Sequence, residues 1–347
     1  MSIALVQREL QPKFSTSIPR LGFVGVGWIG QHRMKALLNA GMAEIAGIAE
    51  PSPELRSQAA QYAPAAALYE SFETLIEQDL DGVVIATPNA FHASQSIAAL
   101  NRRIPVFCQK PLGRNGAEVR SVVEAAQQNN QLLGVDLSYR HLSGVRQIKQ
   151  LIEGEEIGKI FAADLVFHNA YGPDKSWFYD RKLAGGGCVL DLGVHLVDLA
   201  FWMLGNAGVR SVRSQLFSKG RFLVDSSNEV EDFATAMMEL DNGLVLNLNC
   251  SWKLHAGCDA VISATFYGTK GGLRVSNVNG SFYDFQAERF NGTSRALLST
   301  PGEEWGGKRI IDWAQKLSLN SAFDHEITSI IQVSEVLDQI YRQGTRP

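Results

Sequence analysis

Cysteine is scarce in this chain of 347 residues. The four cysteines are widely spaced and form no CxxC pair: Cys108, Cys188, Cys250 and Cys258. This spacing argues against a structural zinc site, and no other cluster has metal-ligand spacing, so we expect no metal. So few cysteines in so long a chain indicate reduced thiols in a reducing compartment.

Long apolar runs are also missing. The richest one, Leu196–Leu204, is interrupted by Asp198 and is shorter than the roughly 18 residues that a bilayer requires. The apolar run near the start, Ile3–Val6, is too short for a signal peptide. We therefore expect a cytoplasmic protein that does not act at a membrane.

Charge of either sign is not in excess. Acidic side chains number 36 and basic ones 32, for a net charge of −4, and no basic block occurs. This balance argues against nucleic acid as a partner. No GxSxG motif occurs, which excludes the nucleophile turn of the serine hydrolases. Hydrophobic residues make up 45% of the chain, as in a globular protein, and the length predicts about two domains.

The first part of the chain alternates between short apolar runs and amphipathic stretches. Residues 1–18 carry no clear pattern and are taken as an N-terminal extension. The apolar runs that follow are Leu21–Val26, Glu44–Ala49, Ala66–Tyr69, Gly82–Thr87, Pro105–Gln109 and Leu132–Leu137. Helix-like stretches lie between them, so residues 19–138 are predicted to form a doubly wound α/β domain, with a parallel sheet covered on both faces.

The pattern changes after residue 138, and residues 139–347 are predicted to form a second domain. Along Leu244–Trp252, apolar and polar residues alternate, as in an antiparallel strand with one covered face. Asp241-Asn242-Gly243 precedes this run and predicts a hairpin. The other expected strands are Lys159–Phe167, Val212–Phe217, Asp232–Leu240, Ala260–Tyr267 and Ser281–Gln286, and residues 323–342 are expected to form a final helix.

The first apolar run ends in a glycine motif that is typical of dinucleotide-binding folds. The segment reads Gly25-Val26-Gly27-Trp28-Ile29-Gly30, with a helix pattern after it. In this context the glycines allow a tight turn, close approach of the pyrophosphate and close helix packing. Glu50 lies twenty residues past Gly30, where a carboxylate accepts hydrogen bonds from the ribose of NAD and repels the extra phosphate of NADP. The alternative is a glycine turn that binds nothing.

Polar residues follow two further strands of the predicted parallel sheet. Thr87, Asn89 and His92 follow the fourth run, and Lys110 follows the fifth. Because ligands of such sheets bind beyond the carboxyl ends of the strands, these residues are predicted to lie on the cofactor side. The alternative for Lys110 is a solvated surface lysine.

A second polar cluster follows a glycine-rich stretch. Asp191 and His195 are four residues apart, and Asp198 continues the same helical stripe. Polar groups in line on an otherwise apolar helix suggest the wall of a site. The alternative is a buried, hydrogen-bonded Asp–His pair without a catalytic role.

Together these motifs resemble one family. GxGxxG followed by His32, then TPN-x-x-H, x-K-P and GGG-x-x-x-D-x-G-x-H-x-x-D resemble the Gfo/Idh/MocA oxidoreductases, which include glucose–fructose oxidoreductase and inositol dehydrogenase. The resemblance runs from about residue 20 to 275. It implies a Rossmann domain and a C-terminal α+β domain with a large, mainly antiparallel open sheet, through which such proteins form homodimers or homotetramers.

The resemblance also implies chemistry. An NAD(P)-dependent oxidoreductase of this kind moves a hydride between nicotinamide and a carbinol carbon of a sugar, cyclitol or related polyol. Lys110, Asp191 and His195 match the family's catalytic residues, with His195 as general base and Lys110 stabilising the reacting oxygen. Some members assign the proton to the lysine, and the sequence does not choose between the two. The cofactor contacts would come from Gly25, Gly27, Trp28, Ile29, Gly30, Glu50, Thr87, Asn89, His92 and Lys110, with NAD favoured over NADP.

Substrate contacts are expected beside the catalytic residues Asp191 and His195. The candidates are aromatic and hydrogen-bonding side chains suited to a polyhydroxylated ring: Tyr139, Arg140, His168, Tyr171 and Trp177. Each has an ordinary alternative as a packed core or interface residue.

The chain departs from the family pattern at one motif position. Gln109 replaces the motif glutamate and removes a negative charge beside Lys110. Two other functions stay open within the resemblance: an NAD-assisted glycosidase, and a non-catalytic dinucleotide-binding sensor.

Overall fold

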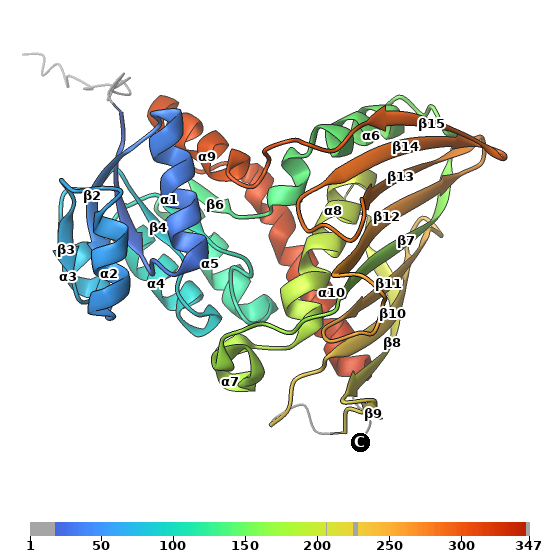
Figure 1. Cartoon of the computed structure of the whole chain (residues 1–347), viewed down its shortest axis with the longest axis horizontal. Helices are drawn as coiled ribbons and strands as arrows, with labels where there is room; N and C mark the ends of the chain where they lie inside the picture. The colour runs from blue at the N-terminus through green and yellow to red at the C-terminus, as the bar shows by residue number, and fades with distance from the viewer. Residues whose placement is uncertain (1–17, 206, 225–227, 345–347) are drawn as a thin grey trace, which may run out of the picture.

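The computed structural model describes residues 18–205, 207–224 and 228–344. Two sheets stand side by side with helices between them (Figure 1). The N-terminal extension predicted for residues 1–18 lies outside the described residues, except for Ile18.

The first sheet is parallel and has six strands in the order β3-β2-β1-β4-β5-β6. Its strands are β1 (Arg20–Val24), β2 (Glu44–Ala49), β3 (Ala67–Tyr69), β4 (Gly82–Ile85), β5 (Val106–Cys108) and β6 (Leu133–Val135). Its helices are α1 (Trp28–Ala40), α2 (Pro53–Ala60), α3 (Phe72–Leu75), α4 (Asn89–Asn101) and α5 (Gly116–Gln128). This arrangement confirms the doubly wound prediction. The strand order reverses between β1 and β4, and such a switch point is where ligands bind in these folds.

The second sheet has nine strands in the order β15-β14-β13-β12-β7-β11-β10-β8-β9. They are β7 (Ile160–Asn169), β8 (Val209–Ser218), β9 (Arg221–Phe222), β10 (Phe233–Leu240), β11 (Val245–Ser251), β12 (Ala260–Gly268), β13 (Gly271–Asn277), β14 (Phe285–Asn291) and β15 (Ser294–Ser299). All neighbours pair antiparallel except β7 and β11, so the prediction of a mainly antiparallel sheet is confirmed.

The sequence patterns located most of these strands but not all. Gly243 makes the predicted hairpin between β10 and β11 with a positive φ of 82°. The patterns did not predict β9, β13 and β15, and the strand expected at Ser281–Gln286 begins only at Phe285. In β15, four consecutive residues from Ser294 are exposed, so this edge strand lacks the alternation that would have identified it.

The remaining helical segments connect the two sheets. They are η1 (Ser138–His141), α6 (Ser143–Glu153), η2 (Ser176–Tyr179), α7 (Arg181–Ala184), η3 (Val189–Gly193), α8 (Val194–Leu204), α9 (Lys308–Leu319), η4 (His325–Thr328) and α10 (Ser329–Gly344). Helices α8 and α10 lie between the sheets (Figure 1) and contact each other. In the described residues, the run Arg181–Leu204 alone is long and apolar enough to cross a membrane. Because 78% of its most apolar window is buried inside the protein, we interpret this run, which contains α7, η3 and α8, as part of the protein core.

Helix α9 belongs to the core of the first domain, although the whole of 139–347 was predicted as the second. The Trp313 ring lies 5.6 Å from that of Phe107 on β5 and is 1% exposed. Gly82 and Gly134 leave room for this ring, because a Cβ at either position would crowd it. The prediction failed here because the amphipathic pattern of a helix does not say which sheet it covers.

Candidate active site

The glycine loop after β1 is built for an anionic group. Gly25 has a φ of +77°, and a Cβ there would lie 2.6 Å from the carbonyl of Ala86. A Cβ on Gly30 would overlap the Gly25 carbonyl, whereas no atom lies within 4 Å of a Cβ on Gly27. Two glycines therefore allow tight packing, and Gly27 borders open space at the start of α1.

The start of α1 leaves its positive end available. No side chain caps this helix, and its first turn holds no acidic residue. Trp28 and Ile29 stand in that first turn, with Trp28 68% exposed. Unsatisfied N–H groups and the helix dipole there favour a phosphate, so the loop fits the pyrophosphate of a dinucleotide.

Glu50 follows β2 next to this loop. Its carboxylate accepts hydrogen bonds from the backbone N–H of Val26 at 3.1 Å and of Ser52 at 3.0 Å. Arg56, the nearest arginine in sequence, donates to the Glu50 carbonyl at 2.5 Å and pairs with Glu70 at 3.6 Å. The carboxylate is thus fixed at the position that distinguishes NAD from NADP.

Two predicted cofactor residues make polar contacts within the protein. Asn89 donates its amide hydrogen to the carbonyl of Ala184 at 2.8 Å, and His92 places its ring nitrogens 2.7 Å from the carbonyls of Thr87 and Pro111. Both are buried, and burial lowers the pKa of His92. These contacts hold the loops around Asn89 and His92 together. A cofactor contact of either residue stays a prediction.

Thr87 stays a predicted cofactor contact. Its hydroxyl donates to the Gln95 side chain at 2.8 Å, and its position after β4 lies on the cofactor side of the sheet.

An ion pair between the two domains forms the centre of the site. The Lys110 ammonium, which follows β5, lies 2.7 Å from Oδ1 of Asp191 and donates to the Asp191 carbonyl at 2.8 Å. The indole N–H of Trp252 donates to Oδ2 of Asp191 at 3.1 Å. Lys110 and Asp191 are 20% and 16% exposed, so the pair is shielded yet reachable.

The glycine-rich stretch before Asp191 is explained by two residues far away in the sequence. A Cβ on Gly186 would overlap the Tyr341 hydroxyl, and one on Gly187 would overlap the Glu231 carbonyl. The buried Glu231 carboxylate accepts hydrogen bonds from the N–H of Gly187 at 3.0 Å, the N–H of Val189 at 2.9 Å and the Tyr341 hydroxyl at 2.8 Å. It thereby fixes the start of the π-helical turn η3 that carries Asp191.

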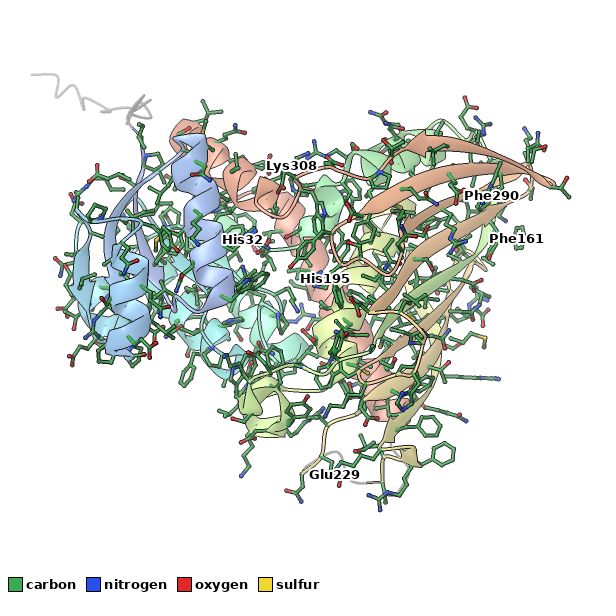
Figure 2. The ribbon with its side chains drawn as sticks, in the orientation of Figure 1. His32, Phe161, His195, Glu229, Phe290 and Lys308 are labelled. Carbon is green, nitrogen blue, oxygen red and sulfur yellow. The ribbon has the colours of Figure 1, made fainter. Side chains whose placement is uncertain are left out.

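His195 lies between the two sheets, in the first turn of α8 (Figure 2). Its ring centroid is 5.0 Å from that of Tyr139, and its Nδ1 is buried without a hydrogen-bond partner among the described residues. Burial, and next the charge of Lys110, hold the pKa of His195 well below 6.5. The imidazole is therefore neutral at neutral pH and able to accept a proton.

Of the substrate candidates, Tyr139 is brought to the site and two others are not. Arg140 donates from Nε to the buried Asp198 carboxylate at 2.8 Å. His168 bonds Ser251 at 2.8 Å on the opposite face of the sheet from Phe167, whose ring lies 6.3 Å from that of Tyr139. Because neighbouring strand residues point to opposite faces, His168 points away from Tyr139. The Arg140 guanidinium is engaged by Asp198, and a substrate contact of either residue stays a prediction.

The last two candidates lie on the strand-end side of the second sheet. Tyr171 is 57% exposed, and its hydroxyl donates to Asp259 at 2.7 Å. Trp177 stacks on Phe178 with ring centroids 3.8 Å apart, and Phe178 in turn contacts Trp252. Trp177 therefore connects to the ion pair through aromatic contacts, and Tyr171 is held at the surface. In the described residues, no group of three or more His, Cys, Asp or Glu side chains could hold a metal ion.

Comparison with known proteins places this geometry in a family. Residues 19–137 match the model of an oxidoreductase family with an NAD-binding Rossmann fold, and residues 145–274 match that of the GFO/IDH/MocA C-terminal domain. The chain belongs to the Gfo/Idh/MocA oxidoreductases. The enzyme is therefore an NAD-dependent oxidoreductase.

Three relatives of this oxidoreductase illustrate the family. D-glucoside 3-dehydrogenase of Escherichia coli is 27% identical over 205 residues, which cover 56% of this chain and 58% of that protein. Levoglucosan dehydrogenase of Pseudarthrobacter phenanthrenivorans is 28% identical over 285 residues, which cover 75% of this chain and 72% of that protein. A solved levoglucosan dehydrogenase in complex with NADH and levoglucosan superposes with a TM-score of 0.79 at 23% identity, covering 94% of this chain and 97% of that one.

Several residues of the site were not anticipated. Trp252, Glu231 and Tyr341 act on the turn that bears Asp191, but each lies at least 38 residues from it in sequence. Asp136 belongs to this group as well, because it accepts a hydrogen bond from Gln109, the neighbour of Lys110. No local motif marks such residues, since their role depends on tertiary packing.

The open space at Gly27 generates a prediction for the cofactor. Gly27→Val should fold normally, because the backbone there has a φ of −63° and no atom crowds a Cβ. NAD affinity, measured by calorimetry, should fall at least about tenfold because the side chain fills the phosphate position. Wild-type affinity in a folded variant would contradict this assignment.

Proposed function

We propose that this oxidoreductase oxidises a carbinol carbon of a sugar, cyclitol or related polyol with NAD. The observation that carries the proposal is the joining of Lys110, Asp191 and a neutral His195 at the interface of the cofactor domain and the second sheet. The relatives act on compounds of this class, including levoglucosan and D-glucoside by their names.

NAD, when bound, accepts the hydride. The residues that would hold it are the glycine loop with Gly27 at its open edge and Glu50 at the ribose position. The other steps belong to the side chains around the ion pair.

Lys110 and His195 have different tasks in this proposal. Lys110 uses two hydrogen bonds to Asp191, and because an ammonium has three donors, one remains for the substrate oxygen. Negative charge developing on that oxygen is stabilised by the ammonium. His195, kept neutral by burial and by Lys110, takes the hydroxyl proton as general base. Both carboxylate oxygens of Asp191 accept hydrogen bonds, one from Lys110 and one from Trp252. We therefore assign Asp191 the task of orienting the Lys110 ammonium, and the proton transfer to His195.

The proton assignment predicts the pH profile. A base with a lowered pKa stays neutral at more acidic pH, so activity persists below 6.5 and is lost as the pH falls through the lowered value. We expect the acidic limb of kcat/KM, measured with a stable buffer series, to lie below that of an ordinary histidine. An acidic limb at pH 6.5 or above would show that a group other than His195 accepts the proton.

Removing the lysine tests the reaction itself. Lys110→Ala should lower turnover by about 10²–10³-fold, because the stabilisation of the reacting oxygen is lost, while NAD binding persists. The assay follows NADH absorbance over a panel of sugars, inositols and glycosides, with NAD and NADP compared. A variant with full activity would refute the assignment. Glycoside cleavage without net NADH would instead favour the glycosidase, and tight NAD binding without turnover would favour the sensor.

We also propose that the chain forms a homodimer or homotetramer through the outer face of the second sheet. Apolar side chains are exposed on β7, β10 and β12: Phe161 is 53% exposed, Met237 40% and Tyr267 37%. Figure 2 shows Phe161 on the side of the sheet away from the helices. Such surface favours an interface.

The oligomer proposal is tested in solution. Met237→Glu places a charge on this face and should shift sedimentation toward the monomer, whereas Gln127→Glu on the exposed side of α5 should leave it unchanged. A monomeric wild-type protein, or an oligomer that ignores Met237→Glu, would oppose the proposal.

A further inference from the structure

A buried carboxylate joins the cofactor helix to the loop that carries Lys110. Asp136 follows β6 and is 1% exposed. Its Oδ2 accepts hydrogen bonds from Arg33 Nε on α1 and from Gln109 Nε2, each at 2.5 Å, and its Oδ1 accepts one from the Ser138 hydroxyl at 2.5 Å. Three segments distant in sequence thus meet at one side chain.

The donors around Asp136 require a charged acceptor. Burial opposes the charge, but the Arg33 guanidinium and the hydrogen bonds from Arg33, Ser138 and Gln109 outweigh it, and the pKa of Asp136 is lowered. The Arg33 side chain is itself only 8% exposed and has this carboxylate as its salt-bridge partner. Removing the carboxylate would leave a buried cation unpaired, which is strongly destabilising.

The Gln109 side chain supplies the donor that this position requires. Its amide donates to Asp136, and its backbone N–H donates to the Ile85 carbonyl at 2.9 Å. A glutamate at 109, as in the motif that the chain otherwise follows, would place a second carboxylate against the first. Because like charges at such short range repel, and Arg33 is the one guanidinium paired with Asp136 among the described residues, a second carboxylate in the cluster would be unpaired.

We propose that Asp136 is a positioning residue: it supplies from β6 the carboxylate that the motif places at 109, and through Gln109 and Arg33 it fixes Lys110 relative to the cofactor helix. The proposal rests on the proposed function, because Lys110 is the residue whose position matters. It is distinct from the ion pair with Asp191, which acts on Lys110 from the other domain.

An exchange of the two side chains tests this. Gln109→Glu creates two facing carboxylates, Asp136→Asn leaves Arg33 without its partner, and the double variant moves the carboxylate from 136 to 109. Exposed Gln127→Glu and Asp79→Asn carry the same chemical changes as controls. Tm, NAD affinity by calorimetry, and kcat and KM at a temperature where every variant is folded are measured for all.

Each single variant should lose about 5–10 °C in Tm and bind NAD several-fold more weakly. Its kcat should fall about tenfold or more with a smaller change in substrate KM, because misplacing a catalytic group acts on the chemical step. The double variant should regain most of all three. Losses that simply add in the double variant, or folded single variants with wild-type kcat and NAD affinity, would overturn the proposal.

A gentler variant keeps the test decisive if Asp136→Asn does not fold. Gln109→Met keeps the Arg33–Asp136 pair and removes only the amide donor, so kcat should fall while Tm changes little. An unchanged kcat there would also overturn the proposal. If the wild-type enzyme turns over no polyol, the proposed function fails, whereas recovery of Tm and NAD affinity in the exchange variant still decides where the carboxylate is needed.

Discussion

The ion pair between Lys110 and Asp191 is the contact on which the site depends. Its two partners come from different domains: the lysine follows a strand of the parallel sheet, and the aspartate stands on a turn that packs against the antiparallel one. With its nitrogen 2.7 Å from the carboxylate and both side chains mostly shielded, the pair sets the distance between the cofactor loop and the substrate side. His195 becomes useful because of it, since the nearby ammonium helps to keep the imidazole neutral.

Much of this arrangement could be predicted from the sequence. The glycine loop, Glu50 and Lys110 follow local rules, because a strand that ends in a motif delivers its side chains to a known edge of the sheet. Asp191 followed from a polar stripe on an otherwise apolar helical segment. The doubly wound domain followed from apolar runs that recur six times before residue 138. These features depend on the chain within a few residues, which is the range that sequence patterns describe.

What a motif does not determine at the site is how each side chain is engaged. Asn89 and His92 stand on the expected edge, but the Asn89 amide N–H donates to the carbonyl of Ala184, and the His92 ring nitrogens lie 2.7 Å from the carbonyls of Thr87 and Pro111. His168 stands on the expected strand but one residue out of phase, so its ring faces away from His195. A motif predicts where the backbone of a residue lies. The hydrogen bonds of its side chain, however, come from segments that lie elsewhere in the sequence and belong to no common motif.

Segments that lie far apart in the sequence are joined at the side chains of a few carboxylates. Asp136, Asp191 and Glu231 each accept hydrogen bonds from at least two segments that are distant from one another in sequence. A buried carboxylate adds little net stability, because the cost of its desolvation offsets the attraction to its donors. It does restrict the geometry, since every donor must point at the same oxygens or remain unsatisfied. In this oxidoreductase such carboxylates therefore determine where the loops of the site lie, while the apolar core determines whether the chain folds.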